Sequence, residues 1–309
     1  MKIHTSKDVQ LALKSGRPIL ALESTIIAHG MPFPDNLNFA QQGESLCKDR
    51  GVVPAIIAII NGNIHAGLEE DMLMFIAKNN SVRKTSSREL GMAIAEKWHG
   101  ATTVSSTMHI AHQLGISVFA TGGIGGVHRG AENSFDISQD LSALAKIPMI
   151  VVSAGAKAIL DLPKTVEMME ALGINVVGYK TNEFPAFYSR KSGVLGIHPV
   201  GSDLEIANIY KANIYSCISS AILVANPVPK NDEIPNQEIE SIINSSCQAA
   251  KTQNIIGKEL TPFLLKDILD KTSGRSLKTN RALAMNNIKL GAGIAKKLAQ
   301  SKDVPSDAP

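Results

Sequence analysis

The chain has 309 residues, of which 44% are hydrophobic and 19% charged, so it can bury a sizeable core. The net charge of +3 and the aromatic content of 4% argue against a nucleic-acid partner, which needs a basic surface or base-stacking side chains. No apolar run reaches the ~20 residues of a membrane span, and the N-terminus lacks the apolar core of a signal peptide. The three cysteines, Cys47, Cys217 and Cys247, show no paired or metal-type spacing. We therefore expect a reduced, cytoplasmic protein with a small-molecule ligand.

Apolar strand-like runs alternate with helical segments along the chain, and the last quarter is helical. The first half predicts helices at 6–15, 37–50, 68–78, 89–98 and 104–114, strands at 18–22, 54–60 and 116–121, a loop at 29–36 and an extended stretch at 82–88. The second half predicts strands at 148–152, 174–179 and 221–225, and helices at 163–172, 203–211, 237–253, 262–272 and 280–299. Continuously apolar strands are typical of a mostly parallel sheet covered on both faces. We expect a three-layer α/β/α fold in a single domain over residues 1–309, with 300–309 as a frayed tail.

A glycine-rich segment follows the strand that ends at Thr121. Four of the five residues from Gly122 to Gly126 are glycine, which suits a loop whose backbone passes close to a ligand. The spacing fits neither the G-x-G-x-x-G dinucleotide motif nor a G-K-[ST] phosphate loop. A tight turn and a ligand-binding loop both remain open, although the carboxyl ends of strands are where open α/β sheets bind ligands.

Lys157 follows the next apolar strand and a Ser-Ala-Gly-Ala stretch. The simplest interpretation is a solvated lysine at the start of a helix. A helix start, however, disfavours a cation, and apolar neighbours also disfavour the charged form. Both effects would favour the neutral amine that a Schiff-base nucleophile requires.

Three acidic residues have two interpretations each. Glu23 ends an apolar run, where a carboxylate is costly unless it is hydrogen-bonded structurally or used in function. Asp136 and Asp140 are four residues apart and could hold a divalent cation through oxygen ligands. Alternatively, Asp136 caps a helix, with Gln139 three residues later.

Lys84, which precedes a threonine and a serine, is either a surface residue or a phosphate contact.

Several long motifs occur together in one order. They are ALESTIIAHGMPFPDN, PAIIAII, KTSSREL, GATTVSSTM, VFATGGIGGVHRGAENSFDIS, VVSAGAKAILD and LVANPVP, followed by GKELTPFLL and SLKTN. Over about residues 10–295 the chain resembles the pseudouridine-5′-phosphate glycosidases, also called the indigoidine synthase A-like family. The resemblance implies an α/β/α fold, a homotrimer and a divalent cation, usually Mn²⁺. It also implies reversible conversion of pseudouridine 5′-phosphate and water to uracil and ribose 5-phosphate.

The resemblance also implies roles for ten residues. Lys157 would be the nucleophile, which forms an imine with the ring-opened ribose, and Glu23 would be the proton donor. Asp136 would bind the metal. The expected substrate contacts are Lys84, Val104, Ser138, Gln139 and Asp140, and further pocket residues are His128 and Asn280.

Two other functions remain open from the residues alone. A Schiff-base aldolase acting on sugar phosphates would share the lysine but would release no uracil. A non-catalytic sugar-phosphate sensor would need neither Lys157 nor Glu23, and the sequence contains both.

Overall fold

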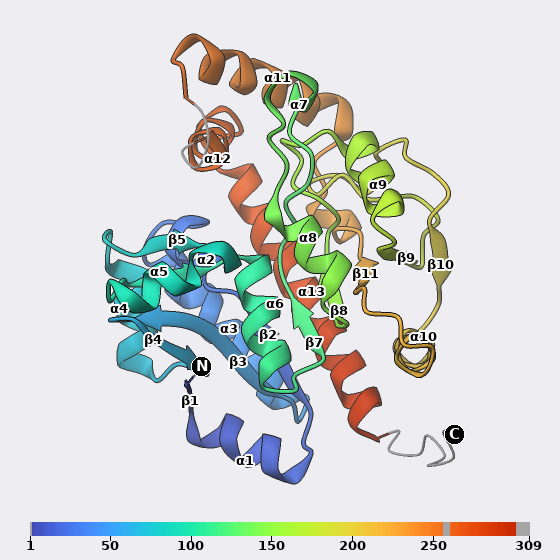
Figure 1. Ribbon diagram of the computed structural model, residues 1–309. Coiled ribbons are helices and arrows are strands. Elements are labelled where there is room, and N and C mark those ends of the chain that lie inside the picture. Colours follow the sequence, from blue (N-terminus) through green and yellow to red (C-terminus); the bar gives the residue numbers. More distant parts are fainter. Residues whose placement is uncertain (1, 256–259, 301–309) are drawn as a thin grey trace.

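A computed structural model of the protein describes residues 2–255 and 260–300 (Figure 1). Its strands form one eleven-stranded sheet, whose main order is β1-β4-β3-β2-β7-β8-β11-β9-β10, with β6 pairing β3 and β5 pairing β6. The strands are β1 (Ile3–Thr5), β2 (Ile19–Leu22), β3 (Val53–Ile60), β4 (Asn63–Ala66), β5 (Arg83–Thr85), β6 (Gly100–Thr102), β7 (Val118–Ala120), β8 (Ile150–Ser153), β9 (Asn175–Tyr179), β10 (His198–Val200) and β11 (Ile222–Ala225).

The sheet is mostly parallel, as predicted. Only the pairs β3–β4 and β3–β6 are antiparallel among the described strands. In the centre, β2 pairs with β7, and β7 with β8, both in parallel register. The four residues of β2 and the four of β8 are all buried, which explains their continuous apolar sequences.

Helices cover both faces of this sheet and make three layers (Figure 1). On one face, α13 packs against β2, β7 and β8, while α3 packs against β3. On the other face lie α6, which contacts β2 and β3, and its neighbour α8, followed by α9 beside β9. The three-layer α/β/α prediction is therefore confirmed. The helices named so far are α3 (Asp35–Asp49), α6 (Val104–Gln113), α8 (Gln139–Lys146), α9 (Leu162–Ala171) and α13 (Arg275–Gln300).

The remaining helices surround these layers. α11 and α12 pack on each other at the top of Figure 1, and α12 also contacts α13. α10 packs against α13. The remaining helices are α1 (Lys7–Ser15), α2 (Thr25–His29), α4 (Glu70–Lys78), α5 (Leu90–Ala95), α7 (Ala131–Ser134), α10 (Asp203–Tyr215), α11 (Asn236–Thr252) and α12 (Leu260–Lys271), with 3₁₀ turns η1 (Ser87–Glu89) and η2 (Lys230–Asp232).

Local sequence signals set several helix boundaries. The hydroxyl of Ser6 accepts a hydrogen bond from the main-chain N–H of Val9 and caps α1, which ends at Gly16 in the left-handed conformation. Asp161 caps α9 by accepting from the N–H of Lys164, and Pro163 occupies the first turn.

Some predicted boundaries were wrong. The predicted loop 29–36 overlaps helix: Thr25–His29 forms α2, and α3 begins at Asp35. Strands β1, β4, β6 and β10 went unpredicted because none of them forms a continuous apolar run like those of β2, β8 and β11. Gln300, placed in the predicted tail, is the last residue of α13, and the other residues of that tail, 301–309, lie outside the described part of the chain.

Candidate active site

The glycine loop after β7 is hydrogen-bonded to the segment after β8. The N–H of Ala154 donates to Gly122 O at 2.9 Å, the N–H of Ile124 to Gly155 O at 3.0 Å, and the N–H of Lys157 to Ile124 O at 3.0 Å. Parallel pairing thus continues beyond both strand ends. Gly155 has φ +81°, and a Cβ there would lie 2.5 Å from the carbonyl oxygen of Pro185. This close packing fixes the main chain that carries Lys157.

Lys157 does not lie at a helix start, so that part of its sequence interpretation was wrong. It lies in the loop between β8 and α9, four residues before the capping residue Asp161. The neighbours that follow it, Ala158 and Ile159, are buried, as the apolar pattern indicated.

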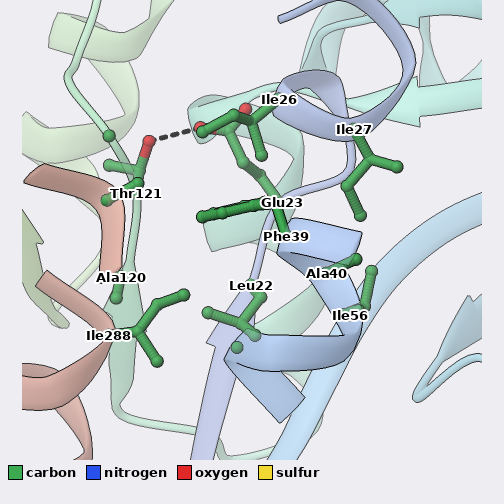
Figure 2. A pocket seen from close by; sticks show the side chains of 13 residues that line it. Leu22, Glu23, Ile26, Ile27, Phe39, Ala40, Ile56, Ala120, Thr121 and Ile288 are labelled. Carbon is green, nitrogen blue, oxygen red and sulfur yellow. Dashed lines mark hydrogen bonds between the residues drawn. The ribbon is translucent and has the colours of Figure 1, made fainter. Parts of the chain in front are cut away.

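Glu23 lies at the carboxyl end of β2 beside the end of β7. Its side chain is buried, and the hydroxyl of Thr121 donates a hydrogen bond to Glu23 Oε1 (Figure 2). Burial raises the pKa of the Glu23 carboxyl, and Asp140 reinforces this rise. Lys157, the Thr121 hydrogen bond and Lys84 oppose it. The net effect is a raised pKa, so the carboxyl group keeps its proton at pH values where glutamate is usually ionised, as a proton donor requires.

A pocket of about 280 Å³ opens at this edge of the sheet and gathers nine of the ten residues assigned roles from the resemblance. Other lining side chains include Thr25, Ser86, Arg88, Thr103 and Thr261. The nine are Glu23, Lys84, Val104, His128, Asp136, Ser138, Gln139, Asp140 and Lys157.

Asn280, the tenth residue, lines an adjoining cavity of about 50 Å³. Glu23, Lys84 and Lys157 line both spaces. Asn280 is buried and its Oδ1 has no hydrogen-bond partner among the described residues. A ligand donor reaching this cavity could satisfy that oxygen.

Asp140 binds the protein's own main chain. Its Oδ2 accepts a hydrogen bond from the N–H of Gly125 at 2.8 Å, and its Oδ1 accepts from the N–H of Ser105 at 3.1 Å. The carboxylate therefore joins the glycine loop to the first turn of α6. A Cβ at Gly125 would lie 2.2 Å from Ser138 Oγ, so the loop approaches this segment as closely as only glycine allows.

The prediction that Asp136 caps a helix was wrong. Ser138 caps α8 instead, with its hydroxyl accepting from the N–H of Asp140 at 3.2 Å. Asp136 lies two residues before this capping position, because α8 begins only at Gln139.

The Asp136 carboxylate faces the pocket near His128. Asp136 Oδ2 lies 3.9 Å from His128 Nδ1, and the side chains are 40% and 15% exposed. Burial lowers the pKa of His128; Lys157 and Lys84 add to this, while Asp136 opposes it. Within residues 2–255 and 260–300, no three His, Cys, Asp or Glu side chains form a metal cluster. A divalent ion in this pocket could use the 40% exposed Asp136 carboxylate, with water or substrate oxygens as further ligands, an arrangement common for Mg²⁺.

Sequence analysis did not assign a role to Thr121 or Thr25. Thr121 directly follows β7, whereas Thr25 is the first residue of α2 and donates from Oγ1 to Thr102 O at 2.8 Å. The position of Thr121 at the end of a strand beside the strand of Glu23 is the signal that could have identified it. That signal requires the strand order, which the sequence did not supply.

The fold and the pocket define a three-layer α/β/α protein with an enzyme-type site at the carboxyl edge of its sheet. The model of the family described as "Indigoidine synthase A like protein" matches residues 8–297, and the chain belongs to this family.

Its relatives include two pseudouridine-5′-phosphate glycosidases. That of Mesorhizobium japonicum is 50% identical over 94% of this chain and 95% of the relative. That of Caldanaerobacter subterraneus subsp. tengcongensis is 48% identical over 96% of each chain.

Two crystal structures share the fold. An indigoidine synthase A-like protein from Thermotoga maritima has a TM-score of 0.88 at 36% identity, covering 96% of each chain. Prealnumycin C-glycosynthase AlnA, in complex with ribulose 5-phosphate, has a TM-score of 0.89 at 32% identity, covering 96% of this chain and 97% of the other.

None of the described helices is long and apolar enough to cross a membrane.

Proposed function

We propose that the protein is a pseudouridine-5′-phosphate glycosidase, which cleaves the C-glycosidic bond of its substrate with water to give uracil and ribose 5-phosphate. The observation that carries this proposal is that Lys157 and the buried carboxyl of Glu23 line one pocket together with Lys84. A nucleophilic amine, a proton donor and a phosphate-binding cation are the three groups that the reaction requires. The names of relatives about half identical to this chain support the same substrate.

The bond to be broken joins two carbons, so protonating a leaving heteroatom does not suffice. The Lys157 amine attacks C1′ of the ribose, and Glu23 gives its proton to the ring oxygen as the C1′–O4′ bond breaks. The nitrogen bound to C1′ then loses one proton, and C5 of the base gains one. The lone pair on this nitrogen forms the iminium as the C1′–C5 bond breaks and uracil leaves. Water then hydrolyses the imine, which frees Lys157 and ribose 5-phosphate.

The structural relative with bound ribulose 5-phosphate supports an open-chain intermediate. A 2-ketopentose whose O5 carries phosphate cannot close a furanose ring. A protein of this fold thus binds an open-chain pentose phosphate.

Asp136 would hold a Mn²⁺ or another divalent cation, and carboxylate oxygen is a suitable ligand for such ions. When bound, the ion would organise water and pyrimidine oxygens. His128 Nδ1 lies 3.9 Å from the Asp136 carboxylate. We also propose that the protein is a homotrimer and is located in the cytoplasm. Light scattering after size-exclusion chromatography measures the oligomeric state.

The test is to incubate the protein with pseudouridine 5′-phosphate and Mn²⁺ and to quantify uracil and ribose 5-phosphate by chromatography. We expect equal amounts of both. An absence of uracil with every divalent ion tested would contradict the proposal. Cleavage of a sugar phosphate between its own carbons would instead indicate an aldolase.

A further inference from the structure

We propose that Thr121 is a positioning residue for Glu23: its hydroxyl holds Oε1 and leaves Oε2 as the oxygen that gives the proton to the substrate. This inference rests on the proposed function and adds a residue to its proton-transfer step. The observation behind it is the hydrogen bond from Thr121 Oγ1 to Glu23 Oε1 between two buried side chains.

The sheet itself creates this contact. β2 and β7 pair in parallel, with Ala21 opposite Phe119 and Leu22 opposite Ala120. Glu23 and Thr121 are the next residues along the two strands, so they lie side by side at the carboxyl edge.

The main chain of Thr121 is held on both sides. Its N–H donates to Val152 O at 3.0 Å, and its carbonyl oxygen accepts from Asn287 Nδ2 at 2.8 Å. Asn287 Oδ1 accepts in turn from Asn226 Nδ2 at 2.9 Å, and both asparagines are buried. A β-branched side chain on a fixed main chain has few rotamers. The position of the hydroxyl is therefore determined by the sheet and by α13.

Beneath Glu23 lies an apolar cavity of about 20 Å³ (Figure 2). Of the described residues that line it, only Glu23 and Thr121 have polar side chains; the others include Leu22, Ile56 and Ile288. A bound water needs two to four polar partners, so water is a poor substitute for the hydroxyl on this side. The charged groups that act on Glu23 from the other elements are Lys157, Asp140 and Lys84.

The chemistry explains why the hydroxyl matters. When Glu23 gives its proton to the ribose ring oxygen, the carboxyl becomes a carboxylate and the ring oxygen becomes a hydroxyl group. A donor held at Oε1 binds the carboxylate more strongly than the neutral carboxyl, so it stabilises the transition state more than the ground state. Because the hydroxyl hydrogen occupies Oε1, the acidic proton is placed on Oε2.

The first test compares Thr121→Val, which removes the hydroxyl at nearly constant volume, with Thr121→Ser, which keeps it. We expect Thr121→Val to lower kcat about ten- to a hundredfold with little change in KM, as for loss of a hydrogen bond to a charged group. Thr121→Ser should retain most of kcat. In a Glu23→Gln background, Thr121→Val should cost little more, because the two residues act together. Equal losses in the Ser and Val variants would assign Thr121 a packing role and overturn the proposal, as would a full loss in the Glu23→Gln background.

The second test needs no substrate. The Glu23 carboxyl is titrated by NMR in ¹³C-glutamate-labelled protein, and its signal is identified by its absence from Glu23→Gln. We expect the pKa of Glu23 to be higher in Thr121→Val than in the parent and close to the parent in Thr121→Ser. An unchanged pKa in Thr121→Val overturns the proposal. If the parent releases no uracil, the proposed function fails, but this titration still decides whether Thr121 positions Glu23. If Thr121→Val does not fold, Thr121→Ala takes its place.

Discussion

The main-chain N–H of Lys157 donates a hydrogen bond to the carbonyl oxygen of Ile124 at 3.0 Å, which joins the lysine segment to the glycine loop. The lysine side chain therefore starts from a main chain that is hydrogen-bonded to the glycine loop beyond the end of β7. A nucleophile held in this way needs little reorganisation before attack.

We expect Lys157 to form an imine with ribose 5-phosphate. Borohydride reduction in the presence of ribose 5-phosphate should add one sugar-phosphate mass to the peptide that contains Lys157. Lys157→Ala should lose this adduct, whereas Lys164→Ala, which changes a lysine paired with Glu132 at the surface, should keep it. Trapping of equal yield on the same peptide of Lys157→Ala would exclude the lysine as nucleophile.

Glu23→Gln should fold and lose about 10²–10⁴-fold in turnover, the range of general acid–base catalysis. Its stability should also respond to pH differently from that of the parent. Glu23 has an ordinary pKa of 4.5 and a raised pKa in the folded protein. Below the ordinary value both states are protonated; above it the unfolded chain ionises first, so the parent loses stability as pH rises through the folded pKa.

The measurement for this second effect is the free energy of unfolding in urea from about pH 4 upward, for both proteins. The parent should lose about 1.4 kcal/mol relative to Glu23→Gln for each unit by which the pKa is raised. A constant difference across pH would show that the folded and unfolded pKa values are equal.

Asp136→Ala should weaken Mn²⁺ binding, because Asp136 supplies the pocket's carboxylate that is most exposed to a bound ion. Calorimetric titration with Mn²⁺ measures the affinity independently of activity. Glu132→Gln, which alters a carboxylate paired with Lys164, is the matched control and should bind as the parent does. Unchanged affinity in Asp136→Ala would move the metal elsewhere.

Lys84→Ala should erode the preference for pseudouridine 5′-phosphate over pseudouridine. A charge-assisted contact to phosphate is worth roughly 1.5–3 kcal/mol, or about ten- to a hundredfold in kcat/KM. The comparison requires kcat/KM for both substrates in parent and variant. An equal loss with both substrates would place Lys84 in the chemistry or the fold. The same comparison with Arg88→Ala tests a second cation that lines the pocket.

Asp140→Asn replaces one carboxylate oxygen by an amide NH₂ group. One of the two main-chain N–H groups that Asp140 accepts from, that of Ser105 or that of Gly125, would then face a donor instead of an acceptor. We expect this loss to destabilise the protein by about 1–3 kcal/mol. Activity should fall as well, because the glycine loop is displaced. Urea unfolding and kcat are measured together. A variant of parental stability but low activity would show that Asp140 contacts substrate instead.

The sequence supports the layers of this fold better than the details of its site. Strands β2, β3 and β8 could be predicted because each is a continuous apolar run, and buried parallel strands require such runs. The partner of Glu23 could not, because it lies 98 residues away, directly after β7, and the contact depends on strand order. The true start of α8 at Gln139, rather than directly after Asp136, likewise depends on the conformation of the preceding loop.

The register of β2 and β7 has one more consequence. Glu23 and Thr121 are anchored to strands at the centre of the sheet, where hydrogen bonds open only with the whole molecule. Thr261, on α12, faces the same pocket from a helix that packs mainly on other helices. The proton donor is thus tied to the centre of the sheet, whereas Thr261 belongs to a helix held mainly by α11 and α13. A displacement of α12 would therefore change the pocket lining at Thr261 and leave the contact between Glu23 and Thr121 in place.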